Sequence, residues 1–168
     1  MTGTIVRLIK TTDVLAYMAV EERLRELGLV LPTAPAAAGA YVPTVRVGDL
    51  LFVAGQLPYE NGTVKVQGKL GKDLTIEAGY SAARQCGLNA LSQIKEALGS
   101  LDNIKKFVRV VGFINSDDGF GDQPKVLNGA SELFGQIFGD RGKHTRLAIG
   151  VNSLPKQAAV EVEVLVEV

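Results

Sequence analysis

The pattern of apolar and polar residues along the chain predicts an α+β fold. Residues 44–58, TVRVGDLLFVAGQLP, contain two strand-like patterns around a Gly-Asp turn, which is typical of a β-hairpin. Residues 63–66 form a further short strand pattern, and residues 104–115 and 146–151 have the Val, Ile and Phe content of strands. Residues 158–168 place a valine at every second position with mostly glutamates between, which predicts a strand with one apolar face.

Two longer helices and one short helix are expected between and before these strands. A helix over residues 75–99 begins at the N-cap Thr75. Its inward face consists of positions that alternate four and three apart, namely Ile76, Tyr80, Ala83, Gly87, Ala90, Ile94 and Ala97. We expect the small residues of this face to let the helix lie close on a sheet. A second helix is expected from about Pro124 to Gly139, and residues 20–27, VEERLREL, predict a short amphipathic helix.

The resulting order is β-β-β-α-β-α-β-β, and the simplest packing is a mixed β-sheet with two helices on one face. The other face of that sheet is half apolar, so we expect a copy of the same sheet to cover it in a closed cyclic oligomer. Residues 1–35 are interpreted as an N-terminal extension with the short helix, and residues 36–168 as the α+β domain. Residues 1–17 resemble an N-terminal leader more than a targeting peptide, because Asp13 interrupts their basic character.

Charge and cysteine content narrow the class of protein. Eighteen basic residues balance eighteen acidic ones, so no basic field is present to collect nucleic acid. The single cysteine, Cys86, permits no intrachain disulfide, and no secretory signal or membrane-length apolar run is evident. We therefore expect a cytoplasmic protein with no membrane or nucleic-acid partner.

Motifs for cofactors and metals do not fit the chain. Residues 62–69, GTVKVQGK, resemble a phosphate-binding loop, but the spacing is one residue too long and Leu70 replaces the magnesium-binding hydroxyl. One histidine and one cysteine far apart do not make a zinc site. No cofactor and no metal are expected.

Several polar residues remain as candidates for chemistry. Arg146, at the start of a strand, could hold a carboxylate with its planar guanidinium, or it could be a surface arginine paired with an acid. Glu161 could handle protons if it is half buried, or it could lie on a solvated strand face. Asn128 and Tyr41 are either ligand contacts or ordinary surface and packing residues, and His144 is interpreted as an exposed loop histidine.

Five stretches in the same order resemble the RidA (YjgF-like) family of reactive-intermediate deaminases, formerly called L-PSP endoribonucleases. The resemblance extends over about residues 36–168. It rests on the long helix and on four quoted stretches, GAYVPTVRVGDLLFVAGQLP, VLNGASELF, TRLAIGVNSLP and VEVEVLVEV.

The resemblance implies a fold similar to trimeric bacterial chorismate mutase, in which three sheets form a barrel and a ligand cleft lies at each subunit interface. By the same resemblance, Arg146 matches the arginine that clamps the substrate carboxylate, and Glu161 matches the glutamate that positions or activates water. Gly55 and Tyr41 match residues that line and close the cleft, and Asn128 matches an asparagine of the family motif near it. A homotrimer is the expected assembly.

The implied reaction is hydrolysis of enamines or imines such as 2-aminoacrylate to a 2-oxo acid and ammonia, which needs neither metal nor cofactor. The chain departs from the family pattern at His144, Leu147, Ala54 and Ser153, which indicates a divergent subgroup. A carboxylate-binding trimer without turnover is therefore an alternative, and an endoribonuclease is a third hypothesis that the balanced charge disfavours.

Overall fold

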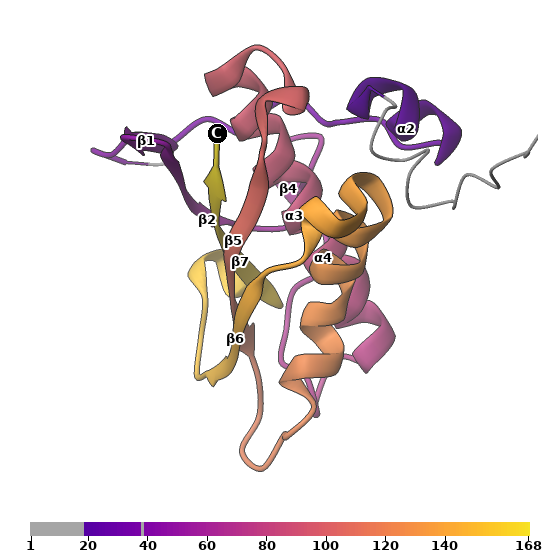
Figure 1. Ribbon diagram of the computed structural model, residues 1–168. Coiled ribbons are helices and arrows are strands. Elements are labelled where there is room, and N and C mark those ends of the chain that lie inside the picture. Colours follow the sequence, from indigo (N-terminus) through magenta and orange to yellow (C-terminus); the bar gives the residue numbers. More distant parts are fainter. Residues whose placement is uncertain (1–18, 38) are drawn as a thin grey trace, which may run out of the picture.

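A five-stranded mixed sheet with helices on one face organises the protein (Figure 1). The computed structural model describes residues 19–37 and 39–168, so the expectation for residues 1–17 lies outside the described residues. In the sheet, the strand order is β1-β2-β7-β5-β6. The strands are β1 (Thr44–Val47), β2 (Leu50–Gln56), β5 (Lys106–Asn115), β6 (Thr145–Val151) and β7 (Val160–Glu167). The helices are α2 (Val20–Glu26), α3 (Ile76–Leu98) and α4 (Gln123–Phe138).

The sheet is mixed because α4 connects β5 to β6. These two strands pair in parallel, which requires a crossover, whereas the other neighbours pair antiparallel. The predicted α+β class and mixed sheet are confirmed. The predicted third strand is only β4 (Thr63–Val64), which pairs with β3 (Tyr59–Glu60) in a separate two-stranded sheet.

The ends of α3 follow the sequence signals. The Thr75 hydroxyl accepts a hydrogen bond from the Ala78 N–H at 3.2 Å, and Gly99 ends the helix at φ 76°, which favours glycine. Gly87, expected to face the sheet, instead packs against Leu133 and Phe134 of α4. The small residues of α3 therefore bring two helices together as well as helix and sheet.

The core lies between the sheet and the α3–α4 pair, which run side by side along one face (Figure 1). Phe107 of β5 stacks on Phe134 of α4 with 4.4 Å between ring centroids, and Phe138 lies 5.0 Å from Phe107. These contacts fix α4 against β5, and α4 in turn supplies side chains to the start of β6. Val20 and Leu24 of α2 are also buried in this core.

Two glycines of α4 provide a matched test of this packing. A Cβ on Gly129 would collide with the Tyr80 carbonyl oxygen of α3, so Gly129→Ala is expected to destabilise the fold by about 1–3 kcal/mol or more. A Cβ on Gly135 would meet nothing within 4 Å, so Gly135→Ala should stabilise the helix by about 0.5–1 kcal/mol. Urea unfolding of both variants measures the difference, and equal effects would show that α3 and α4 do not pack this tightly.

The sheet face opposite the helices carries exposed apolar side chains. Strand register places Phe52 on the same face as Val45 and Leu165, and it places Leu147 and Ile149 beside Val111 and Phe113. The large exposed apolar residues of this surface, called the open face below, are Val45, Val47, Phe52, Leu147 and Ile149. Several large exposed apolar residues on one face of a sheet are typical of protein interfaces.

Candidate functional site

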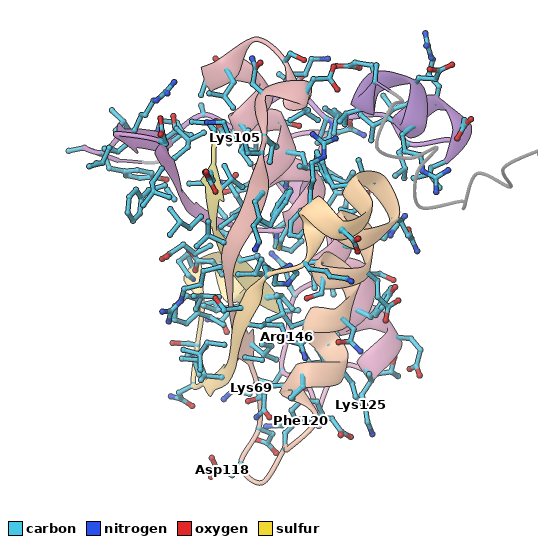
Figure 2. The ribbon with its side chains drawn as sticks, in the orientation of Figure 1. Lys69, Lys105, Asp118, Phe120, Lys125 and Arg146 are labelled. Atoms are coloured by element: carbon cyan, nitrogen blue, oxygen red, sulfur yellow. The ribbon has the colours of Figure 1, made fainter. Side chains whose placement is uncertain are left out.

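Arg146 lies at the start of β6 and points toward the helices. It pairs with Val110 of β5, whose side chain is fully buried in the core, so Arg146 shares the helix-covered face of the sheet. Its Nη1 donates to Asn128 Oδ1 at 2.6 Å and lies 3.4 Å from Ser131 Oγ. Arg146 is labelled in Figure 2. Asn128 and Ser131 stand three residues apart on α4 and therefore on one helix face. The structure thus brings two of the predicted site residues, Arg146 and Asn128, together.

His144 is half buried, contrary to the expectation of an exposed loop histidine. Its Nδ1 lies 2.7 Å from the Gly142 carbonyl oxygen and its Nε2 lies 3.0 Å from Ser131 Oγ. Burial lowers the pKa of His144, the Arg146 charge lowers it further, and the hydrogen bond to Gly142 opposes both. Neutral imidazole is therefore the favoured form near pH 7. The sequence signal for this contact was weak, because it depends on the position of a loop against α4.

Glu161 lies near the start of β7, on the open face. A register irregularity in β2 next to Gly55 lets the Glu161 carboxylate occupy the space that a side chain at position 55 would fill. Burial raises the pKa of Glu161, and the neighbouring Glu163 raises it further. A carboxyl group with a raised pKa is suited to proton transfer near neutral pH.

A cavity of about 440 Å³ opens at Glu161. It collects Tyr41, Gly55 and Glu161, three of the predicted site residues, together with Ala54 and Gln93. The mixture of apolar walls with a few polar groups is typical of small-molecule sites. Here the structure brings together residues that are more than one hundred positions apart in the sequence.

Buried polar side chains of α3 hold one wall of this cavity, and sequence reasoning missed them. Gln93 donates to the Pro35 carbonyl oxygen at 2.6 Å, and Ser92 donates to that of Pro32 at 2.8 Å. Asn89 donates to the carbonyl oxygens of Leu57 and Tyr59 at 2.8 and 3.1 Å. Three polar residues within five positions of an otherwise apolar helix were the available signal. The hydrogen bonds of Ser92 and Gln93 tie the segment before β1 to the helix, and those of Asn89 tie the chain just after β2 to it.

Within one chain, Arg146 and Glu161 are not brought together. Phe113 pairs with both Ile149 and Glu161, so these two share the open face, and Arg146, three residues before Ile149, lies on the other face. Two strand spacings of about 4.8 Å and three residues of about 3.3 Å also separate them. The candidate residues therefore form two half-sites: Tyr41, Gly55 and Glu161 in the first, Asn128 and Arg146 in the second.

The divergent positions fall on different surfaces. Leu147 follows Arg146 but points to the open face, where it is exposed beside Val111, so it does not narrow the space around the guanidinium of its own chain. Ser153 is exposed in the loop before β7. In the part of the chain that the structure describes, no group of three His, Cys, Asp or Glu side chains could hold a metal ion. No helix of that part is long and apolar enough to cross a membrane.

Comparison with known families identifies the fold. The family described as "YjgF/chorismate_mutase-like, putative endoribonuclease" matches residues 21–168. The chain belongs to this family. Among YjgF-like relatives, Protein TCP17 of Trypanosoma cruzi is 45% identical over 156 residues, which cover 92% of this chain and 98% of TCP17. The predicted membership in the RidA and YjgF group is confirmed.

Solved YjgF-like structures agree with the fold. A protein from Shewanella oneidensis named as an endoribonuclease has a TM-score of 0.87 and 39% identity, covering 90% of this chain and 100% of that chain. Atu1372 of Agrobacterium tumefaciens, of unknown function, has a TM-score of 0.82 and 41% identity, covering 89% and 92%. RidA from an Antarctic Psychrobacter, at 26% identity, has a lower TM-score of 0.58 over 81% and 94% of the two chains.

Proposed function

We propose that the protein hydrolyses reactive enamines or imines, such as 2-aminoacrylate, to a 2-oxo acid and ammonia. The observation that carries the proposal is Glu161, half buried with a raised pKa against Gly55 in a cavity that Tyr41 also lines. The second support is Arg146, held by Asn128 at the position of the family's carboxylate-binding arginine. Both half-sites contain the residue types that this reaction needs.

The chemistry follows from these groups. Arg146 would hold the substrate carboxylate through charge-assisted hydrogen bonds. Protonated Glu161 would give its proton to the terminal carbon of the enamine, which produces an iminium ion. The resulting carboxylate would take a proton from water as the oxygen bonds to the iminium carbon. Glu161 would then give this proton to the nitrogen, and the C–N bond would break with its electron pair on nitrogen. The hydroxyl of the intermediate would become the carbonyl as its proton returns to Glu161, which releases ammonia with the 2-oxo acid.

A complete site on this proposal requires a second copy of the chain. Arg146 and Glu161 lie on opposite faces of one sheet, so each would act with its counterpart from a neighbouring subunit. The open face supplies the apolar surface for this contact, and a homotrimeric barrel would cover it in every subunit. A reducing compartment such as the cytoplasm belongs to the proposal, because Cys86 is a buried free thiol.

The names of two proteins of the same fold are consistent with this proposal. The Psychrobacter protein is named RidA. Escherichia coli TdcF, 24% identical with a TM-score of 0.57 over 80% of this chain and 93% of its own, was solved with bound serine. Serine carries a carboxylate, which is the group we assign to Arg146.

The test is turnover of 2-aminoacrylate generated in place by a serine dehydratase. The protein is expected to accelerate release of ammonia and pyruvate above the rate in buffer. Glu161→Gln should abolish this acceleration while it preserves binding of pyruvate, because the amide keeps the shape of the carboxyl group and cannot transfer the proton. If the wild-type protein does not exceed the buffer rate under any condition, the deaminase proposal is wrong.

A binding function without turnover is the second candidate, and Ala54 favours it. Ala54 lines the Glu161 cavity at a position where the family usually has a hydroxyl group. Pyruvate binding that depends on Arg146, in a protein without deaminase activity, would support this candidate. RNA cleavage by metal-free protein that is lost in Arg146→Ala would instead support the endoribonuclease name of several relatives.

Assembly can be tested on the open face. Phe52→Glu places a charge among exposed apolar residues and is expected to convert the trimer to monomers, as measured by light scattering during size-exclusion chromatography. Turnover should fall with the loss of assembly. Val30→Glu is the matched control, because Val30 is 85% exposed and lies between α2 and β1, outside the strands. A trimer that survives Phe52→Glu with full activity would show that the open face is not the interface.

A further inference from the structure

A chain of hydrogen-bonding groups connects a backbone carbonyl to the guanidinium of Arg146. The Gly142 oxygen lies 2.7 Å from His144 Nδ1, and His144 Nε2 lies 3.0 Å from Ser131 Oγ. Ser131 Oγ lies 3.4 Å from Arg146 Nη1, which also donates to Asn128 Oδ1 at 2.6 Å. Neither Ser131 nor His144 has a role in the reaction described above.

We propose that His144 and Ser131 are positioning residues for Arg146: neutral imidazole, acting through the Ser131 hydroxyl, orients the guanidinium for a carboxylate ligand, and protonation of the imidazole weakens carboxylate binding. This inference rests on the proposed function, because it assumes that Arg146 binds the carboxylate. It adds a pH dependence and two residues to that site.

The direction of each hydrogen bond follows from the donors and acceptors present. A carbonyl oxygen only accepts, so His144 carries its proton on Nδ1 and donates it to Gly142. Nε2 of neutral His144 is then an acceptor, and the Ser131 hydroxyl donates to it. The lone pairs of Ser131 Oγ therefore remain for Arg146, whose Nη1 is held between two acceptors of α4. Nε and Nη2 of the guanidinium are left to face a ligand.

Protonation of His144 would reverse the hydrogen bond between His144 and Ser131. Imidazolium donates from both nitrogens, so Ser131 Oγ would accept from Nε2–H and from Arg146 at once, and its own proton would turn away from both. Two cationic groups would then share one hydroxyl oxygen, and their repulsion would weaken its hydrogen bond to Nη1. The imidazolium charge by itself would attract an anion, so the proposal requires that the lost orientation of Arg146 outweighs this attraction.

The surroundings leave Arg146 as the charge that most affects His144. Lys143 pairs with Asp140 at 2.8 Å, and Arg141 donates to the Ile104 carbonyl oxygen at 3.0 Å. On α4, Glu132 accepts from the Tyr80 hydroxyl at 2.7 Å. Burial lowers the pKa of His144 and the neighbouring Arg146 lowers it further, so the positioning form prevails at neutral pH.

The fold builds this arrangement and leaves room beside it. A Cβ on Gly142 would collide with the Phe134 carbonyl oxygen, so only glycine lets this loop pack on α4 and present its carbonyl to His144. An open pocket of about 310 Å³ is lined by Ser131, Gly135, Gly142, Lys143, His144 and Arg146. A small ligand could therefore lie against the exposed edge of the guanidinium.

Pyruvate binding across pH tests the proposal, with calorimetry on the full chain in its natural assembly. All measurements use the Glu161→Gln background. Protonation of Glu161 at low pH would itself favour an anionic ligand and would oppose the expected trend. Pyruvate stays ionised throughout the range from about pH 5 to pH 8. The Kd is expected to be constant above neutral pH and to rise several-fold as pH falls below about 6.5, the ordinary pKa of histidine.

Variants separate positioning from a general charge effect. His144→Gln keeps an acceptor for Ser131 and cannot titrate, so it should preserve the Kd at pH 8 and remove the weakening at low pH. His144→Asn, whose amide can donate to Gly142, serves as a second non-titrating variant. Ser131→Ala should raise the Kd several-fold at pH 8, and Ser131→Thr should restore it. Lys143→Gln is the control and should leave the pH dependence unchanged.

The outcomes distinguish this inference from the proposed function. If Arg146→Ala leaves pyruvate binding intact, Arg146 is not the carboxylate site and both proposals fail. If Arg146→Ala abolishes binding but Ser131→Ala binds normally, the positioning role is wrong and the carboxylate site stands. Acid weakening that persists in both non-titrating His144 variants would likewise overturn the role of His144.

Discussion

Arg146→Ala is expected to lower kcat/KM for 2-aminoacrylate by about 30- to 5,000-fold, because truncating one partner of a charge-assisted contact costs about 2–5 kcal/mol. Most of the loss should appear in KM if the arginine binds substrate and transition state equally, and in kcat if it orients the substrate for protonation. Arg146→Lys keeps the charge without the planar fork, so its kcat/KM should lie between those of the wild type and Arg146→Ala.

The structure supplies a control for this substitution. Arg146 is exposed and its side chain hydrogen-bonds to Asn128 and Ser131 of α4, so its removal should leave the thermal midpoint nearly unchanged. Arg84 provides the comparison, because its side chain also donates to a neutral polar side chain, that of Gln136 at 3.2 Å. Arg84→Ala should therefore retain activity. Equal activity of the two alanine variants would remove Arg146 from the site.

Mixed trimers of Arg146→Ala and Glu161→Gln subunits are expected to regain activity that neither variant has alone. If each site combines Arg146 of one subunit with Glu161 of a neighbour, a mixed trimer contains one interface with both intact residues. Random assembly from equal amounts makes roughly three quarters of the trimers mixed, so about a quarter of wild-type turnover should return.

The experiment requires subunit exchange, so the two variants are unfolded and refolded together. Each variant refolded alone, and the two combined after refolding, are the controls and should remain inactive. A double variant with both substitutions in one chain, refolded with wild type, measures the dilution of intact sites. Failure to regain activity in trimers shown to be mixed would mean that the two residues do not share a site across subunits.

Local patterns predicted most of the elements of the fold. The alternation of valine and glutamate predicted β7, and Thr75 and Gly99 lie at the two ends of α3 as expected. These features were predictable because caps and periodicity depend on neighbours in sequence. The short strand over residues 63–66 joined a separate two-stranded sheet instead. No local signal distinguishes these pairings, since strand partners are chosen by tertiary packing.

The candidate site was predictable only in part. The resemblance to the family placed Asn128 near the cleft, and the structure adds its contact with Arg146, which the sequence did not predict. The separation of Arg146 from Glu161 was not visible in the sequence, because it depends on strand order and on which side chains share a face. His144 was predicted to be exposed in a loop, and it lies in that loop but half buried, because its partners Gly142 and Ser131 meet only when the loop closes on α4.

The polar row of α3 has a consequence for the segment that precedes the sheet. Ser92 and Gln93 are nearly fully buried, and each donates to a backbone carbonyl between residues 32 and 35. Without that segment, the Gln93 amide would lose the Pro35 acceptor, at about 1–3 kcal/mol, whereas Ser92 could still donate to the Leu88 carbonyl oxygen at 3.0 Å. The buried polar residues of α3 therefore fit a chain in which residues 32–35 lie against this helix. A relative that lacks this segment should have apolar or water-exposed residues at positions 92 and 93.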